Sequence, residues 1–254
     1  LRLIDESILS VKTPEVLIAG CGTGQHSISS AARLKDSLVT AIDLSKSSLA
    51  FAVRKSMELG YGKINYYRED ILDVDSLKRE FDVVESAGVL HHMENPFEGW
   101  KKLKNVTRPN GLMRIGLYSS LARKNINFFR KKIGDASKIQ SREDIVKLRE
   151  NLLILNDSQI KDIFKMYDFY TVSQFRDLVL HVQEHQYSIP QIKEQLKLLG
   201  LAFCGFESDK IISIFRNKYG KEADIYNLDL WYDFEKSHPD TFVSMYQFWC
   251  QRID

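Results

Sequence analysis

A cluster of glycines directly after a short apolar segment is suited to bringing a ligand against the backbone. Residues 15–19 (EVLIA) lead into Gly20, Gly22 and Gly24, and a helical pattern follows. Glycine lacks the Cβ atom that would block such an approach, and the first amides of the following helix point outward toward negative charge. The spacing departs from the G-x-G-x-x-G fingerprint of dinucleotide sites, because Gln25 stands where the third glycine is expected.

Two aspartates follow the next two apolar segments and extend this pattern to a nucleoside site. Asp43 comes after residues 38–42, and Asp70 comes shortly after residues 64–67. A carboxylate at Asp43 can accept hydrogen bonds from both hydroxyls of an adenosine ribose, and it disfavours a phosphate there. Asp70 is placed for the exocyclic amine of adenine, with Ile71 packing on the ring. Each aspartate taken singly is equally consistent with a helix cap or a turn.

The elements that must position these residues alternate between strands and helices. Strands are predicted at 15–19, 38–42, 64–67, 81–85 and 112–117, and helices at 27–34, 47–59 and 96–106, with Ser45 capping the second helix. This alternation predicts an α/β fold with a doubly wound, mostly parallel sheet and right-handed crossovers. Strands at 201–206 and 241–251 would complete a seven-stranded, Rossmann-like sheet with a helical insertion between the fifth and sixth strands.

The insertion divides the chain into three parts. We expect a core at 1–120, a helical insertion at 121–199 that covers the substrate, and C-terminal strands at 200–254 that complete the sheet; helices are predicted at 191–199 and 231–236. Residues 123–150 carry nine Lys or Arg against four Asp or Glu. Such a stretch is typical of a solvated helical face, and it also suits a docking surface for an anionic substrate or RNA.

The composition excludes several classes of protein. Of the 254 residues, 44% are hydrophobic and 28% are charged, which is ordinary globular usage. The net charge of +2 is too small to indicate that the protein binds a nucleic acid. No apolar run in the sequence reaches membrane-spanning length. Cys21, Cys204 and Cys250 have no close spacing, so neither a disulfide framework nor a thiolate metal site is supported. We expect a cytoplasmic protein without a membrane segment.

Several motifs in register resemble the class I S-adenosylmethionine-dependent methyltransferases. The glycine segment, Asp43 and Asp70 are followed by FDVVESAGVLHHMENP and RPNGLMRIGLYS. The segments DFYTVSQFRDLVLHVQEH and HPDTFVSMYQFWCQ extend the similarity to the methyltransferase module of bacterial proteins that often carry it behind tetratricopeptide repeats. No repeat precedes the module in this sequence, and the usual Pro-Gly-Gly turn is Pro109-Asn110-Gly111. An upstream repeat domain or a separate partner therefore stays an open expectation.

The resemblance implies S-adenosyl-L-methionine as the cofactor and assigns its binding residues. The glycine segment would contact the methionine part, the first acid the ribose, and the second the adenine, while the end of the fourth strand would lie beneath the sulfonium. The implied cofactor residues are Gly20, Cys21, Gly22, Thr23, Gly24, Gln25, Asp43, Leu44, Asp70, Ile71, Glu85 and Ser86.

The acceptor would lie where the fourth and fifth strands end. His91 and His92 follow the fourth strand, and one of them is a candidate for removing a proton from the acceptor or orienting it; the alternative is a histidine hydrogen-bonded into the loop. Tyr118 leaves the fifth strand at the same edge and could line the pocket or pack at the strand end.

Residues 181–185 (HVQEH) spell H-x-x-E-H, which is also an inverted zinc-peptidase signature. A peptidase would need a third ligand and would leave the glycines and aspartates without a role, so we assign no metal. We expect instead a helix here that covers the acceptor, with Tyr170, Arg176, His181 and His185 as candidate lining residues; a surface helix is the alternative.

The sequence therefore predicts a methyltransferase that acts by direct in-line transfer on a small-molecule or peptide acceptor. An RNA or protein methyltransferase is the alternative, although neither an N/D-P-P-Y/F tetrapeptide nor a Pro-Cys pair occurs in the sequence. An oxidoreductase dependent on nicotinamide adenine dinucleotide (NAD) is disfavoured by the glycine spacing, and a noncatalytic binding module by the intact glycines and aspartates.

Overall fold

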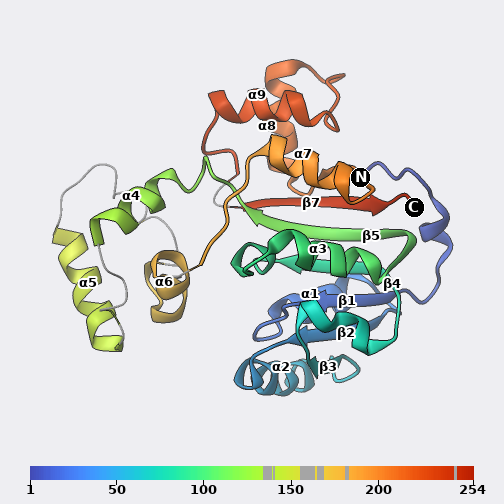
Figure 1. The fold of residues 1–254 in the computed structure, drawn as a ribbon, viewed down its shortest axis with the longest axis horizontal. Coiled ribbons are helices and arrows are strands. Elements are labelled where there is room, and N and C mark those ends of the chain that lie inside the picture. Colours follow the sequence, from blue (N-terminus) through green and yellow to red (C-terminus); the bar gives the residue numbers. More distant parts are fainter. Residues whose placement is uncertain (134–138, 140, 155–163, 165–168, 181–182, 243–244) are drawn as a thin grey trace. The chain divides into compact units, whose positions relative to one another are not determined.

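One mixed sheet organises the described part of the chain and holds seven strands in the order β3-β2-β1-β4-β5-β7-β6 (Figure 1). The strands are β1 (Glu15–Ala19), β2 (Leu38–Asp43), β3 (Asn65–Arg68), β4 (Phe81–Ala87), β5 (Thr107–Tyr118), β6 (Leu201–Phe206) and β7 (Met245–Arg252). Strands β1 to β5 pair in parallel, whereas β7 runs antiparallel to both β5 and β6. The predicted doubly wound, mostly parallel sheet is confirmed.

The computed structural model describes residues 1–254 except 134–138, 140, 155–163, 165–168, 181–182 and 243–244. The described residues fall into two compact units. The first unit comprises residues 1–119 and 185–254 and contains the sheet, and the second comprises residues 120–184. Within these described ranges, no helix combines the length and the apolar character needed to cross a membrane.

The helices of the first unit connect the strands as the alternation predicts. They are α1 (Gln25–Arg33), α2 (Lys46–Glu58), α3 (Pro96–Asn105), α7 (Ile189–Leu198), α8 (Asp209–Tyr219) and α9 (Leu228–Ser237), with 3-10 turns η1 (Ser7–Ser10), η2 (Ile71–Leu77) and η3 (Leu90–His92). Ser45 caps α2 by accepting from the Ser48 amide. Helix α8 was not predicted, although Ser208 caps it in the same way.

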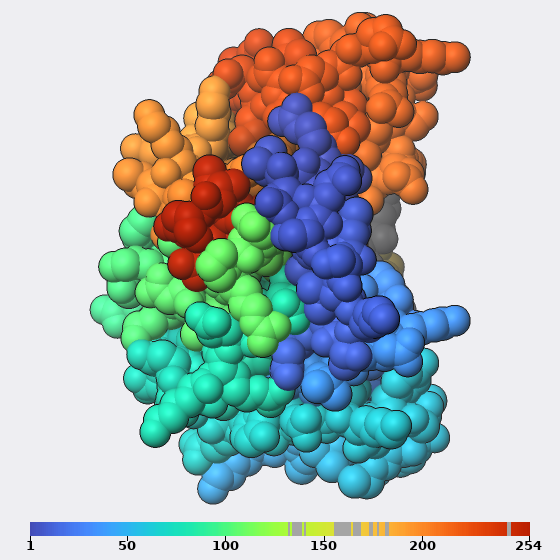
Figure 2. Space-filling model, turned by 90° about the vertical axis from the view of Figure 1, so that its right-hand side faces the viewer, coloured from blue at the N-terminus to red at the C-terminus, as the bar shows by residue number. Residues whose placement is uncertain are grey.

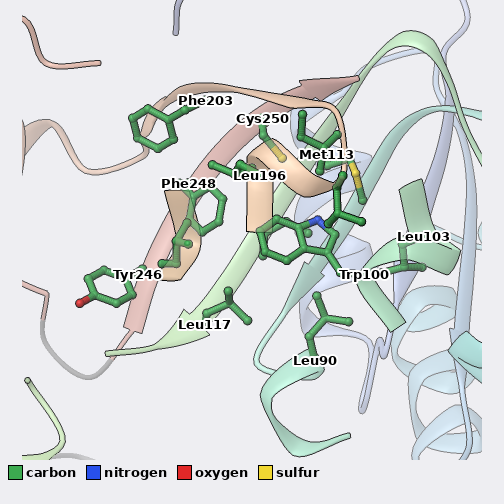
Figure 3. Packing of buried hydrophobic residues seen from close by; sticks show 14 of the residues in the cluster. Leu90, Trp100, Leu103, Met113, Leu117, Leu196, Phe203, Tyr246, Phe248 and Cys250 are labelled. Atoms are coloured by element: carbon green, nitrogen blue, oxygen red, sulfur yellow. The ribbon is translucent and has the colours of Figure 1, made fainter. Parts of the chain in front are cut away.

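Alternate residues of β1 face two different hydrophobic clusters, because successive side chains of a strand point to opposite faces of the sheet. Val16 and Ile18 pack with residues of α1 and α2, whereas Leu17 packs with residues of α3, α7, α8 and α9. Figure 3 shows part of this larger cluster, in which the rings of Trp100 and Phe248 lie with their centroids 6.0 Å apart. Helices thus cover both faces of the sheet.

The N-terminal segment is held against the last strands rather than projecting from the fold. The amides of Ile4 and Asp5 donate to Oε1 of Gln251, and the amide of Arg2 donates to the carbonyl of Cys204. In Figure 2 this segment (blue) crosses the surface beside the C-terminal residues (red). Buried Gln251 of β7 therefore holds the N-terminal segment: its Oε1 accepts from these two amides, and its Nε2 donates to the carbonyl of Asp5 at 2.8 Å.

The second unit contains α4 (Lys124–Ile133), α5 (Arg142–Ile154) and α6 (Val172–Val179) around its own apolar cluster. Helix α7, which the sequence analysis placed in the insertion, belongs to the first unit instead. Its buried Ile189, Ile192 and Leu196 join the larger cluster of the sheet, so its apolar face is satisfied there.

Candidate functional site

The loop after β1 turns sharply toward the edge of the sheet where the parallel strands end. Gly20 has φ +76°, and a Cβ atom on it would lie 2.3 Å from a methyl carbon of Val89. The amides of Gly20 and Cys21 both donate to the carbonyl of Ile42 at 2.9 Å, which ties the loop to β2. Only glycine fits at position 20, since both the conformation and the approach of Val89 exclude a side chain.

Asp43, the last residue of β2, holds this loop through its carboxylate. Oδ2 accepts from the Gly22 amide at 2.8 Å, and Oδ1 accepts from the Ser45 amide at 2.8 Å. Each oxygen keeps a second lone pair for another donor. Burial and the charge of Asp43 raise the pKa of the neighbouring Cys21 thiol to about 12, so this cysteine stays protonated. The loop therefore presents one carboxylate and no thiolate.

A small, mostly apolar pocket of about 210 Å³ lies beside Asp43. It is lined by Gly20, Asp43, Leu44, Glu69, Asp70, Ile71, Val89 and Met93. The structure thus brings together the residues that the sequence analysis assigned to ribose and adenine. Glu69, Val89 and Met93 were missed; Val89 and Met93 lie after β4, and nothing in their local sequence shows that they close on the loop after β1.

Asp70 has a structural task as well as a place in this pocket. Its Oδ1 accepts from the Leu72 amide at 2.9 Å and caps η2. Asp70 is therefore a helix cap, which the sequence analysis gave as the alternative role. It also lines the pocket, so the two roles are compatible. Ile71, which follows it, is buried against the same pocket.

A second, wider crevice of about 480 Å³ shares Gly20 with the first pocket. Its lining combines the glycine loop and α1 with β5 and β7: Gly20, Cys21, Gly22, Thr23, Gln25, His26, Ser29, Arg33, Ala87, Arg114, Met245 and Gln247. Gly24 has a different role, since a Cβ atom on it would lie 2.7 Å from the Cβ of Ala52. Gly24 therefore allows α1 and α2 to approach each other.

The resemblance placed Glu85 beneath the sulfonium as a cofactor residue. In the structure Glu85 is not among the residues that line the crevice. Its side chain is 0% exposed, and its oxygens lie 2.7 Å from Nε2 of His26 and 2.6 Å from a guanidinium nitrogen of Arg33. Burial opposes ionisation of Glu85, but the hydrogen bond from His26 and the charges of His26, Arg33 and Arg114 outweigh it and lower the pKa to about 2. Ser86 beside it is buried, with no hydrogen-bond partner for Oγ among the described residues.

The ends of β4 and β5 bring the predicted acceptor residues together. The rings of His91 and Tyr118 stack with centroids 3.7 Å apart, and His92 meets the Tyr118 ring edge-on at 5.5 Å. The amide of His185 donates to the carbonyl of His91 at 2.8 Å. His91 is 0% exposed, whereas His92, Tyr118 and His185 are each partly exposed. Of the two histidines, only His92 has access to a ligand in this conformation.

The residues around the H-x-x-E-H motif do not form the expected helix. Helix α6 ends at Val179, residues 183–186 are not helical, and His181 lies outside the described residues. The Glu184 carboxylate accepts from Arg123 at 2.7 Å and from Arg130 at 2.7 Å. The carboxylate that a peptidase would use as its base therefore forms ion pairs with two arginines.

Tyr170 and Arg176, the other predicted lining residues, belong to the second unit. Tyr170 donates from its hydroxyl to the carbonyl of Phe164 and is 54% exposed, and Arg176 is exposed on α6. Their part in acceptor binding stays a prediction.

A third pocket of about 600 Å³ adjoins the crevice, because both are lined by Arg114, Met245 and Gln247. The rest of its wall comes from the end of β6, from α8 and from residues 240–242. Arg114 therefore lies on the boundary between two cavities.

Comparison with known sequences relates the chain to a methyltransferase family. Residues 16–111 match a family described as a methyltransferase domain. An uncharacterized protein of Synechococcus sp. is 28% identical over 205 residues, which are 76% of this chain and 48% of that protein.

Two solved structures share the fold. PKMT2 from Rickettsia typhi, in complex with AdoHcy, aligns with a TM-score of 0.68 and 18% identity over 95% of this chain and 49% of that one. Magnesium protoporphyrin IX methyltransferase from Synechocystis, with bound SAH, aligns with a TM-score of 0.52 and 16% identity over 94% of this chain and 74% of that one. The chain spans about half the length of the Synechococcus and Rickettsia proteins.

Proposed function

We propose that the chain is a class I S-adenosylmethionine-dependent methyltransferase that methylates a small-molecule or peptide acceptor. The match of residues 16–111 to a methyltransferase domain supports this proposal. The observation that carries the proposal is the Asp43 carboxylate at the end of β2. It is fixed by two backbone amides and faces a pocket with Asp70 and Ile71. This arrangement suits the two ribose hydroxyls and the adenine of the cofactor.

The residues present fit S-adenosylmethionine at both ends. The small pocket offers a carboxylate, a second acid and the apolar walls of Ile71, Val89 and Met93, which is the combination that a nucleoside requires. The crevice that shares Gly20 with this pocket is more polar and adjoins the glycine loop, so we assign the amino acid end of the cofactor to it.

When bound, S-adenosylmethionine supplies a methyl group that is electrophilic without further activation by the protein. The residues of the chain need mainly to hold an acceptor in line with the breaking bond and to exclude water, and such positioning can account for about 7 to 11 kcal/mol of the barrier. We assign this positioning to Tyr118 and His185, which lie with His91 and His92 at the ends of β4 and β5.

His92 is the group that we assign to removing a proton from the acceptor. It is partly exposed and lies edge-on to Tyr118, whereas His91 is buried under the same tyrosine ring. An imidazole titrates near neutral pH, so it can accept a proton from an amine or a hydroxyl as the methyl group is transferred. His91 would then position Tyr118 through the ring stack.

The test is methyl transfer from a labelled cofactor into pools of metabolites and peptides. Labelled product is expected with the unaltered chain. With His92→Ala, turnover should fall about a hundredfold or more while affinity for S-adenosylhomocysteine is unchanged. His238→Ala is the matched control, because that imidazole stacks on Phe234 at an interplanar angle of 7° on the far end of α9. Equal turnover by the His92→Ala and His238→Ala proteins would refute the role assigned to His92. If the unaltered chain does not bind the cofactor, the proposed function itself is refuted.

A further inference from the structure

The third pocket, where β6 ends and β7 begins, has no part in the sites assigned so far. Its volume of about 600 Å³ exceeds those of the nucleoside pocket and the crevice, and it lies within the range of about 300 to 1,000 Å³ that is usual for small-molecule sites. Its apolar wall consists of Phe206, Ile211, Ile214, Phe242 and Met245. A concave site of this size and character is suited to the body of a small molecule.

The charges around the third pocket favour a neutral ligand. Arg114 and Glu207 pair with each other at 2.7 Å, so these two charges compensate one another. The other two charged lining residues, Lys210 and Asp240, are exposed and opposite in sign. A charge carried against the apolar wall would lose its hydration, which is costly. The pocket therefore selects for an uncharged, apolar ligand.

Met245 connects the third pocket with the crevice beside the glycine loop, because it lines both. Its side chain lies over the ends of β4 and β5. Sδ is 2.7 Å from the position that a Cβ atom on Gly116 would take, and Cε is 3.9 Å from that of one on Gly88. An unbranched methionine side chain adapts to irregular space. The boundary that the two cavities share therefore includes an adaptable side chain beside two glycines.

The same boundary adjoins the residues assigned to the acceptor. Met245 pairs with Tyr118 across β7 and β5, and directly opposed residues of two strands place their side chains on the same face of the sheet. The Tyr118 ring stacks on His91 and meets His92 edge-on. A molecule seated in the third pocket can therefore extend past Met245 toward the crevice and Tyr118.

We propose that the third pocket holds the body of the methyl acceptor, and that this acceptor is a neutral aromatic small molecule with a hydroxyl or amino group. This inference rests on the proposed function and narrows its acceptor from a small molecule or peptide to the former. The rings of Phe206 and Phe242 lie with centroids 4.6 Å apart, and a further ring can pack on them. The reactive group of the acceptor then lies at Met245, facing the crevice.

The transfer itself needs no further reactant. The oxygen or nitrogen of the acceptor forms a bond to the methyl carbon as the bond between that carbon and sulfur breaks, and the electron pair of the broken bond stays on sulfur. The proton of the acceptor passes to His92, the group assigned above to this task.

The first experiment measures binding with probes of different charge. Naphthol, naphthoate and the methylamide of N-acetyl-lysine are each titrated in a calorimeter into the chain saturated with S-adenosylhomocysteine. Ile214→Glu places a charge in the wall of the third pocket, and Ile214 is 39% exposed on α8, so the fold should tolerate it. Leu198→Glu is the matched control, because Leu198 is 68% exposed at the end of α7 and does not line the pocket.

Naphthol should bind the unaltered chain about tenfold or more tightly than either charged probe. Ile214→Glu should weaken naphthol binding by about tenfold or more, whereas Leu198→Glu should leave it within about twofold. Ile214→Trp should also weaken it, because the larger side chain fills the pocket, and this variant serves if Ile214→Glu does not fold. All variants should bind S-adenosylhomocysteine as the unaltered chain does.

The second experiment distinguishes an acceptor pocket from a pocket with another ligand. Methyl transfer from a labelled cofactor is measured into pools of metabolites and of peptides. Label should enter the metabolite pool, and Ile214→Glu should reduce this incorporation by about tenfold or more while Leu198→Glu leaves it unchanged.

Four results would overturn the inference: no binding of naphthol, tighter binding of a charged probe, label in peptides alone, or unchanged incorporation with Ile214→Glu. Failure of the unaltered chain to bind S-adenosylhomocysteine would instead refute the proposed function.

Discussion

Replacing Asp43 with alanine tests the nucleoside site directly. The carboxylate keeps one free lone pair on each oxygen after accepting from Gly22 and Ser45, so it can accept one bond from each ribose hydroxyl. Hydrogen bonds to a charged group contribute about 1.5 to 3 kcal/mol each. Two of them give about 3 to 6 kcal/mol, which corresponds to a Kd for S-adenosylhomocysteine that rises by about two to four orders of magnitude.

Part of that loss could come from the loop, because Asp43→Ala also leaves the Gly22 and Ser45 amides without their acceptor. A ligand analogue that lacks the ribose hydroxyls separates the two effects. The unaltered chain should bind the analogue more weakly than it binds S-adenosylhomocysteine. The Asp43→Ala protein, which has already lost the ribose contact, should bind the two ligands with equal affinity. The coupling between the two changes then measures the ribose contact alone.

Isothermal titration calorimetry is the assay, with thermal melting to confirm that each variant is folded. Asp75→Ala is the matched control, since Asp75 forms an exposed pair with Lys102 and does not line the nucleoside pocket. Its affinity for S-adenosylhomocysteine should equal that of the unaltered chain. A folded Asp43→Ala protein that binds within about threefold of the unaltered chain would refute the assignment of the ribose.

Three further predictions concern the scaffold of the site. Because the pKa of Glu85 is lowered from 4.5 to about 2, its contribution of about 3 kcal/mol is complete above pH 4.5 and is lost as the pH falls toward 2. Glu85→Gln should therefore flatten the fall in unfolding free energy over that range in urea titrations, and an unchanged slope would contradict the ion-pair account. Gly20→Ala should abolish cofactor binding in calorimetry because its Cβ would meet Val89, and adding Val89→Ala should restore binding only in part, since the strain at φ +76° persists. Full recovery in the double variant would show that the strain is unimportant. Trp100→Ala should cost about 3 to 5 kcal/mol in chemical unfolding, and Trp100→Phe clearly less, because Nε1 of Trp100 is buried without a hydrogen-bond partner among the described residues. Equal costs would mean that this nitrogen is satisfied in solution.

Much of the fold followed from local patterns. Short apolar segments that end in glycine or aspartate predicted the parallel strands, and the same residues predicted the nucleoside pocket. Both are properties of neighbouring residues: an apolar run is buried on both faces of a parallel sheet, and the residues after it must lie at the edge where the strands end. The local patterns were therefore sufficient to predict that Asp43 and Asp70 lie near Gly20 in one pocket.

Other features depended on contacts between distant parts of the chain. Every residue from Phe81 to Ser86 is buried, so the strand has no polar alternation that would show which face Glu85 occupies. His26, Arg33 and Arg114 surround Glu85 only after α1 and β5 pack beside β4. The resemblance implied a cofactor contact at Glu85, and the ion pairs that surround this residue could not be read from the sequence.

The same holds for the histidines and for the H-x-x-E-H segment. His91 and His92 are adjacent and chemically identical, and the stack on Tyr118 from β5 buries one while leaving the other accessible. Glu184 fits a metal-site motif by spacing, but pairing with Arg123 and Arg130 assigns it a structural task. The types and local spacing of the residues thus determined the topology and the nucleoside pocket. The tertiary structure decided which side chains are exposed and which charges are paired, because these properties depend on contacts between elements that are distant in sequence.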